Sequence, residues 1–172
     1  MTIDVPSLIV AAGGELVGKI RLQKVVYLLD QMGLSSGFSY EYHHYGPYSE
    51  DLADKVEDEV VFRRIEAAQG RRLSDGVPYV IYRANAPGSG ERLDSHMTAG
   101  MVRDALQEMQ RRSATVLELA ATMHWLAVTE GFADWSTELV RRKGAKTLNG
   151  RKEEAFELLG TLGLPPAVYR AA

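Results

Sequence analysis

Apolar residues in the first sixty positions recur at intervals that predict short helices. Leu22, Val25, Val26 and Leu29 follow the i, i+3, i+4, i+7 spacing of one buried helix face, and Gly33 supplies a C-terminal stop. We expect helices over three ranges of this half of the chain: 6–12, 18–32 and 49–61.

Two other segments have the period of strands. The aromatic stretch 38–45 alternates as a strand does, and Gly46-Pro47 is expected to end it. Farther along, residues 64–68 and 78–84 are β-prone arms around a polar segment, which predicts a β-hairpin.

The pattern becomes helical after the segment APGSGE (86–91), which is the best candidate for a linker. We expect helices over four ranges of this half: 94–111, 114–129, 132–143 and 151–160. The helix over 114–129 is apolar on most of its faces. Its apolar surface would serve as core or as a homodimer interface, and core is the interpretation we favour.

Three short helices followed by a hairpin is the order of a winged helix. We therefore predict an α+β fold, mainly α, with a winged-helix-like part over residues 1–86 and the hairpin as its wing. Residues 92–172 should form a helical part that packs on it, so that the chain makes one compact unit.

The composition is that of a globular protein without cysteine. The 172 residues are 45% hydrophobic and 25% charged, as in ordinary globular domains. The absence of cysteine excludes disulfides, thiolate nucleophiles and Cys-ligated zinc. No apolar run approaches the roughly 18 residues of a membrane span, and no basic stretch precedes the first apolar patch as in a secretory signal. We expect a cytoplasmic protein that makes no membrane contact.

No motif in the chain specifies a reaction. GGELVGKI (13–20) has the glycine and lysine spacing of a phosphate-binding loop, but Ile20 stands where that loop needs Ser or Thr. His43 and His44 are adjacent on a predicted strand and point to opposite faces, which disfavours a shared metal ion. The chain also lacks the G-x-S-x-G turn of serine hydrolases. We predict no catalytic residue, no metal and no cofactor, and a protein that is not an enzyme.

The stretch HHYGPYSEDL has a structural explanation throughout. Gly46 frees the backbone for a sharp exit from the strand, and Pro47 presets the entry to the next helix. Ser49 can cap that helix. Tyr45 and Tyr48 would then flank the corner.

A polar strip lies beside the apolar face of the helix predicted over 18–32. Lys19, Gln23 and Tyr27 are spaced i, i+4, i+8, which places them on one side of the helix. Such a strip either braces a neighbouring turn through inward hydrogen bonds or forms the edge of a binding groove. The sequence leaves both interpretations open.

Arginines gather around the predicted hairpin, as in winged helices whose wing contacts DNA phosphates. They are Arg63, Arg64, Arg71, Arg72 and Arg83. The helix predicted over 49–61 would enter the groove of DNA, yet it carries six acidic residues and one lysine. Regulation through nucleic-acid binding by the arginines is therefore the alternative function and not the favoured one.

The segments GKIRLQKVVYLLD (18–30) and YEYHHYGPYSEDL (40–52) resemble the SocA-like (Panacea) antitoxin domain and its YwgA-like relatives. The residues that match the signature are Lys19, Gln23, Lys24, Tyr27, Tyr45, Gly46 and Pro47. The resemblance implies small prokaryotic or phage-linked cytoplasmic proteins without recognised catalytic residues. The best understood of them are antitoxins, which bind a cognate toxin and neutralise it or deliver it to a protease. The helical C-terminal half looks more like the YwgA-like branch.

Residues and resemblance together predict a non-enzymatic protein-binding module of the antitoxin or adaptor kind, with a protein partner. The expected binding surface is formed by Lys19, Gln23, Tyr27, Tyr45, Gly46, Pro47 and Tyr48.

Overall fold

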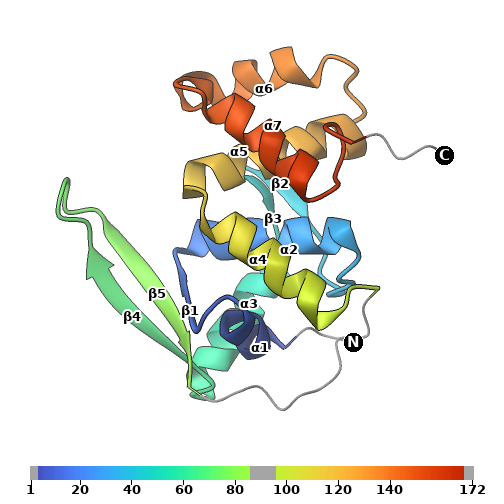
Figure 1. Ribbon diagram of the computed structural model, residues 1–172. Coiled ribbons are helices and arrows are strands. Elements are labelled where there is room, and N and C mark those ends of the chain that lie inside the picture. Colours follow the sequence, from blue (N-terminus) through green and yellow to red (C-terminus); the bar gives the residue numbers. More distant parts are fainter. Residues whose placement is uncertain (1–3, 86–95, 169–172) are drawn as a thin grey trace.

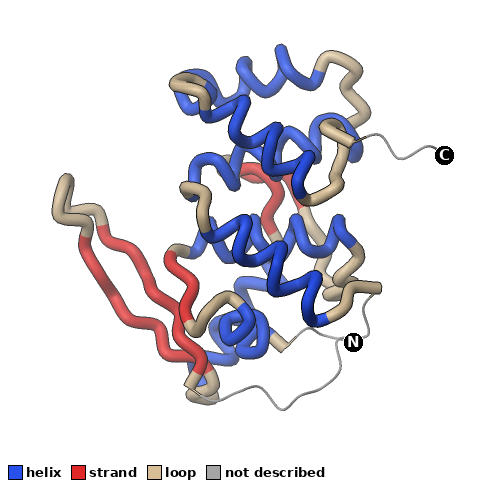
Figure 2. Tube along the Cα trace, viewed as in Figure 1, coloured by secondary structure: helices blue, strands red, loops and turns tan. Residues whose placement is uncertain are grey.

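The computed structural model describes residues 4–85 and 96–168 and confirms a mixed α+β fold that is mainly helical (Figures 1 and 2). The helices of the first part are α1 (Val5–Ala11), α2 (Lys19–Met32) and α3 (Glu50–Val61). Its strands are β1 (Glu15–Val17), β2 (Glu41–His43), β3 (Gly46–Tyr48), β4 (Ile65–Arg71) and β5 (Pro78–Ala84). The second part contains α4 (Ala99–Gln110), α5 (Ala114–His124), a π-helix η1 (Trp125–Thr129), α6 (Trp135–Lys143), a 3-10 helix η2 (Gly144–Thr147) and α7 (Arg151–Thr161).

The strands form two separate antiparallel sheets. One has the order β1-β5-β4, and the other is the small β2–β3 hairpin. In Figure 1 the β4–β5 hairpin projects away from the helices, and Leu73 at its tip is fully exposed. Helices α6 and α7 lie at the opposite end of the molecule from α1 and α3.

Local sequence explains the ends of the central helices. Gly33 follows α2 with a φ of +110°, a left-handed conformation that glycine adopts at little cost. Ser49 caps α3 as predicted, because its hydroxyl oxygen accepts a hydrogen bond from the Leu52 N–H at 3.2 Å. Glu50 and Asp51 in the first turn then complement the helix dipole.

Several boundaries differ from the prediction for physical reasons. The strand predicted over 38–45 is shorter, and Gly46 and Pro47 pair with it as β3 instead of only ending it. A short turn of His44 and Tyr45 allows this pairing, with Gly46 at a φ of +87°. Strand β1 was not predicted because three residues are too few to show a period; it pairs with β5 along Leu16 and Tyr82.

The C-terminal helices also depart in detail. The helix predicted over 114–129 is helical throughout, but its last five residues wind as the π-helix η1. Helix α6 begins at residue 135 instead of 132, because Asp134 caps it by accepting the Thr137 N–H. The linker predicted at 86–91 and the first two residues of the helix predicted over 94–111 lie outside the described residues. That helix, α4, begins later than predicted, at Ala99, because Thr98 caps it by accepting the Met101 N–H at 3.2 Å.

The buried core contains side chains from both parts of the chain. Every residue from Val116 to His124 on α5 is buried, so its apolar surface serves as core. Helix α5 contacts α2, β3 and α7. The β2–β3 hairpin therefore lies between the two parts, held by α2 on one side and α5 on the other.

Candidate functional site

The β2–β3 hairpin and the start of α3 form a corner that α2 braces from below. The Gln23 amide makes two 2.9 Å hydrogen bonds with Ser49: Nε2 donates to the carbonyl, and Oε1 accepts from the N–H. Lys24 donates from Nζ to the Pro47 carbonyl at 2.5 Å. Gln23 and Lys24 are 3% and 1% exposed, so these polar side chains of α2 point into the protein and bond to the backbone of the corner.

A buried charge cluster from the C-terminal part holds the same hairpin from the other side. Glu118 on α5 is 2% exposed and pairs with Lys143 at 2.8 Å and Lys146 at 2.9 Å. Lys143 also donates to the His44 carbonyl at 3.0 Å. Burial lowers the pKa of Lys24 to about 8, an effect that Glu118 opposes and the two other lysines reinforce.

Two further contacts fix the corner against α5. A Cβ placed on Gly46 would meet the Thr122 hydroxyl oxygen at 2.5 Å, so α5 approaches the hairpin closely there. The Tyr27 hydroxyl forms a 2.8 Å hydrogen bond with Nδ1 of His124. Burial lowers the pKa of His124 to about 4, which keeps this imidazole neutral at neutral pH.

A pocket of about 150 Å³ opens beside the braced corner, between α2, α3 and β5. Its lining is mostly apolar and consists of Lys19, Ile20, Leu22, Gln23, Lys24, Tyr45, Tyr48, Ala53, Val56, Glu57 and Tyr82. Tyr45 is 45% exposed at the rim, with the Lys146 ammonium 4.8 Å from its ring centre. Tyr48 is half-buried and stacks on His43 at 4.9 Å.

Helix α3 contributes one carboxylate, Glu57, to the pocket lining and carries others on its exposed surface. Burial raises the pKa of Tyr48, and nearby Glu50, Asp54 and Glu57 raise it further. Five carboxylates of α3 are exposed and form no ion pair with any described residue: Glu50, Asp51, Asp54, Glu57 and Asp58. The helix's lysine, Lys55, pairs instead with the buried Glu59 at 2.9 Å.

The structure divides the predicted binding residues into two groups. Gln23, Tyr27, Gly46 and Pro47 are buried, and their side chains or backbone hold the corner in place. Lys19, Tyr45 and Tyr48 are more exposed and line the pocket, and the buried Gln23 lines it as well. We call this pocket the corner pocket and define it by the eleven lining residues above.

Residues of the C-terminal part that support the pocket were not predicted from the sequence. Glu118 carried a usable signal, because a charged residue within a helix that is apolar on most faces must find a buried partner. Thr122 and Lys143 carried none, since only the packing of α5 and α6 against the hairpin brings them to it.

The arginines around the β4–β5 hairpin are largely engaged within the chain. Arg64 pairs with Glu59, Arg72 with Asp75 at 3.1 Å, and Arg83 with Glu15 at 3.2 Å. Arg71 donates to the Gly76 carbonyl at 3.2 Å. Arg63 is exposed at a φ of +58°, with no ion pair among the described residues. Arg63, Arg64 and Arg83 thus lie at the base of the hairpin, and Arg71 and Arg72 lie near its tip.

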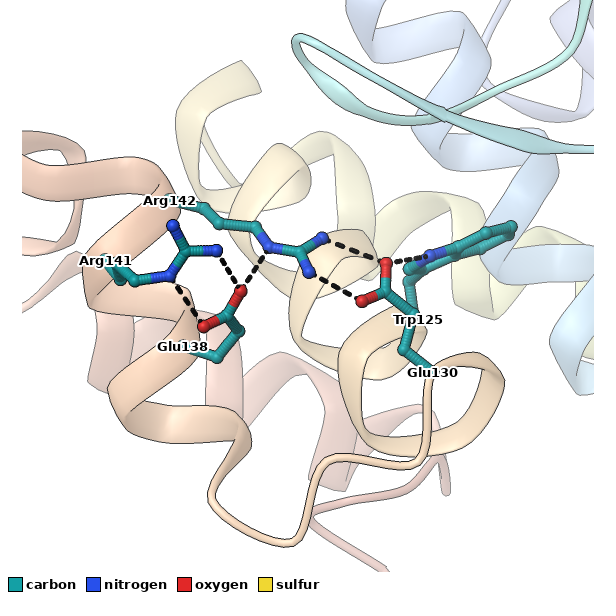
Figure 3. Close-up of polar contacts among 5 residues, drawn as sticks. All are labelled: Trp125, Glu130, Glu138, Arg141 and Arg142. Atoms are coloured by element: carbon teal, nitrogen blue, oxygen red, sulfur yellow. Dashed lines mark hydrogen bonds and ion pairs between the residues drawn. The ribbon is translucent and has the colours of Figure 1, made fainter.

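A second polar cluster fixes α6 to the end of α5 (Figure 3). Arg142 lies between two carboxylates, donating to Glu138 at 2.6 Å and to Glu130 at 2.6 and 2.9 Å. Glu130 also accepts from the Trp125 indole at 3.0 Å. Because the guanidinium also lies 4.7 Å above the Tyr42 ring, this cluster clamps the helical part onto β2 and has its charges satisfied.

The described residues were also compared with the requirements of a metal site and of a membrane-spanning helix. Residues 4–85 and 96–168 hold no cluster of three or more His, Asp or Glu side chains suited to a metal ion. Within the same ranges, no helix has both the length and the apolar character to cross a bilayer.

Comparison with known proteins finds similarity to a bacterial protein. No protein-family model matches the chain. The chain is 24% identical over 151 residues to a Bacillus subtilis (strain 168) protein named "Uncharacterized protein YwgA", which covers 87% of this chain and 89% of that protein. This match supports the YwgA-like name for the family that the sequence motifs resemble.

Proposed function

We propose that the chain is a non-enzymatic protein-binding module of the antitoxin or adaptor kind, which binds its partner protein through the corner pocket. The observation that carries the proposal is an accessible, mostly apolar pocket rimmed by Tyr45, Tyr48 and Lys19. Tyrosine is enriched at protein interfaces because it offers a large apolar area with a polar tip. The buried bonds to Ser49 and Pro47 preorganise this surface, which lowers the entropy lost on binding.

The proposal includes the finer assignments that the motifs suggest. We propose that the part predicted over residues 1–86 is winged-helix-like, with the β4–β5 hairpin as its wing. The element order and the sheet order β1-β5-β4 support this. We also propose a SocA-like (Panacea) relationship, a cytoplasmic location and a toxin as the partner that is neutralised or passed to a protease.

The rival function is nucleic-acid binding through the hairpin arginines. It has less support, because Arg64, Arg72 and Arg83 already form ion pairs within the chain. The exposed carboxylates of α3 would also repel phosphates at the position of a recognition helix.

Affinity capture from the native host, after nuclease treatment, tests the proposal. The tagged parent chain is compared with Tyr45→Ala in the pocket rim and with Phe156→Ala as a matched control. These aromatic side chains are 45% and 40% exposed. We expect one stoichiometric protein with the parent and the control, and recovery reduced about tenfold or more with Tyr45→Ala.

Two results would contradict the proposal. Equal capture by Tyr45→Ala and the parent would remove the pocket from the binding site. Capture that disappears with nuclease, together with recovered nucleic acid, would favour the arginine-bearing hairpin instead. Circular dichroism and thermal melting of each variant establish that lost capture is not lost folding.

A further inference from the structure

The corner pocket is the right size for a single apolar side chain. At about 150 Å³ it matches the volume of engineered apolar cavities that hold a benzene molecule. Leu22, Val56 and Tyr82 supply the apolar lining, and Tyr45 and Tyr48 stand at the opening. A leucine, methionine or phenylalanine side chain of a partner could be buried here.

The surface next to the pocket selects the charge of that partner. The exposed carboxylates Glu50, Asp54 and Glu57 are spaced i, i+4, i+7 and so share one face of α3. Glu57 lines the pocket together with Tyr48, and the negative charges of all three carboxylates raise the pKa of Tyr48. Because they lack an ion pair with any described residue, they are available to cations.

From these two features we propose that the partner presents an extended basic segment, with one apolar side chain in the corner pocket and Lys or Arg side chains along the acidic face of α3. This inference rests on the proposed function and specifies its partner. Glu50 and Glu57 are about 10 Å apart along the helix axis, since α-helices rise about 1.5 Å per residue. An extended chain covers that distance in about three residues.

The same charges exclude other common occupants of this face. Nucleic-acid phosphates and anionic lipid headgroups would be repelled by the carboxylates. An acidic peptide would be repelled equally. Lys19 stands at the α2 side of the pocket, so an acceptor on the partner near its apolar residue would be favoured there.

Selection from a random peptide library displayed on phage tests the inference directly. The bait is the full chain at about 150 mM salt, where charges on the surface are screened beyond about 8 Å. The Tyr48→Ala chain is selected in parallel. We expect peptides enriched by the parent chain alone to carry one large apolar residue within three positions of two or more Lys or Arg residues.

The affinity of the enriched peptides for the parent chain and for charge-reversal variants is then measured by fluorescence anisotropy. Asp54→Lys with Glu57→Lys should weaken binding about tenfold or more, since each rim charge contributes a few-fold. Glu153→Lys with Glu157→Lys is the matched control on α7, where both side chains are exposed, and should leave the affinity within about twofold.

The outcomes separate this inference from the proposed function. Pocket-dependent peptides without basic residues, or basic peptides unaffected by the α3 reversal, would overturn the inference and leave the pocket as a binding site. Identical selection by the parent and Tyr48→Ala chains would overturn both.

Discussion

Replacing Gln23 with leucine is expected to destabilise the protein, although the two side chains are similar in size and the position is 3% exposed. The substitution removes both hydrogen bonds with the backbone of Ser49. The Ser49 N–H then has no replacement partner in a buried position, whereas its carbonyl still accepts the Ala53 N–H at 3.2 Å.

The magnitude follows from this asymmetry. An orphaned buried N–H costs about 1–3 kcal/mol, and loss of the second bond to the carbonyl costs about 0.5–1.5 kcal/mol. The gain from burying a leucine in place of an amide offsets about 1 kcal/mol. We expect a net loss of about 2 kcal/mol in the free energy of unfolding, or roughly 4–8 °C in melting temperature for a chain of this size.

Urea and thermal unfolding followed by circular dichroism measure this loss. Gln69→Leu on β4 is the matched control, because Gln69 is exposed and its replacement should stay within about 0.5 kcal/mol of the parent. If Gln23→Leu falls in the same narrow range as this control, the amide does not hold the corner and the argument for a braced pocket fails.

Gln23→Glu refines the same test through pH. An ionised carboxylate can accept the Ser49 N–H but repels the Ser49 carbonyl, whereas a protonated carboxyl has one donor and one acceptor, like the amide. The folded state should therefore bind a proton at this position more readily than the unfolded state. The stability deficit relative to the parent should shrink as the pH falls below about 5.

Two other predictions concern contacts between the hairpin and α5. The pKa of His124 is lowered from 6.5 to about 4 by burial, so between these values the unfolded chain binds a proton that the folded chain does not. The free energy of unfolding should fall by up to about 3 kcal/mol as the pH drops from 6.5 to 4. Unfolding curves of His124→Gln should lack that pH-dependent loss, and a pH profile equal to that of the parent would be contrary evidence. Gly46→Ala should cost about 2–5 kcal/mol, from its φ of +87° and the 2.5 Å approach to the Thr122 hydroxyl oxygen. Thr122→Ala should recover about half of that loss in a double-mutant cycle, and the isosteric Thr122→Val should recover none of it; additivity of Gly46→Ala and Thr122→Ala would refute the clash.

The motifs in residues 18–52 predicted the turn at Gly46-Pro47 and the cap at Ser49, but not which way each polar side chain of α2 points. Helical periodicity placed Lys19, Gln23 and Tyr27 on one side of α2. It could not decide between bracing and binding, because that depends on which segment packs against the strip. In the tertiary structure Gln23 hydrogen-bonds to Ser49 and Tyr27 hydrogen-bonds to His124, both inside the protein. Lys19 lies at the pocket.

The sequence by itself determined the mainly helical α+β character, the cap at Ser49 and the stop at Gly33, since these depend on residues within one or two turns of each other. Only the tertiary structure decided where the pocket opens and what supports it. Glu118 and Lys143 reach the hairpin from 74 and 99 residues away in the chain, counted from His44. Strand β1 likewise exists through its pairing with β5. No local pattern encodes such contacts, because their free energy comes from burial and pairing between distant segments.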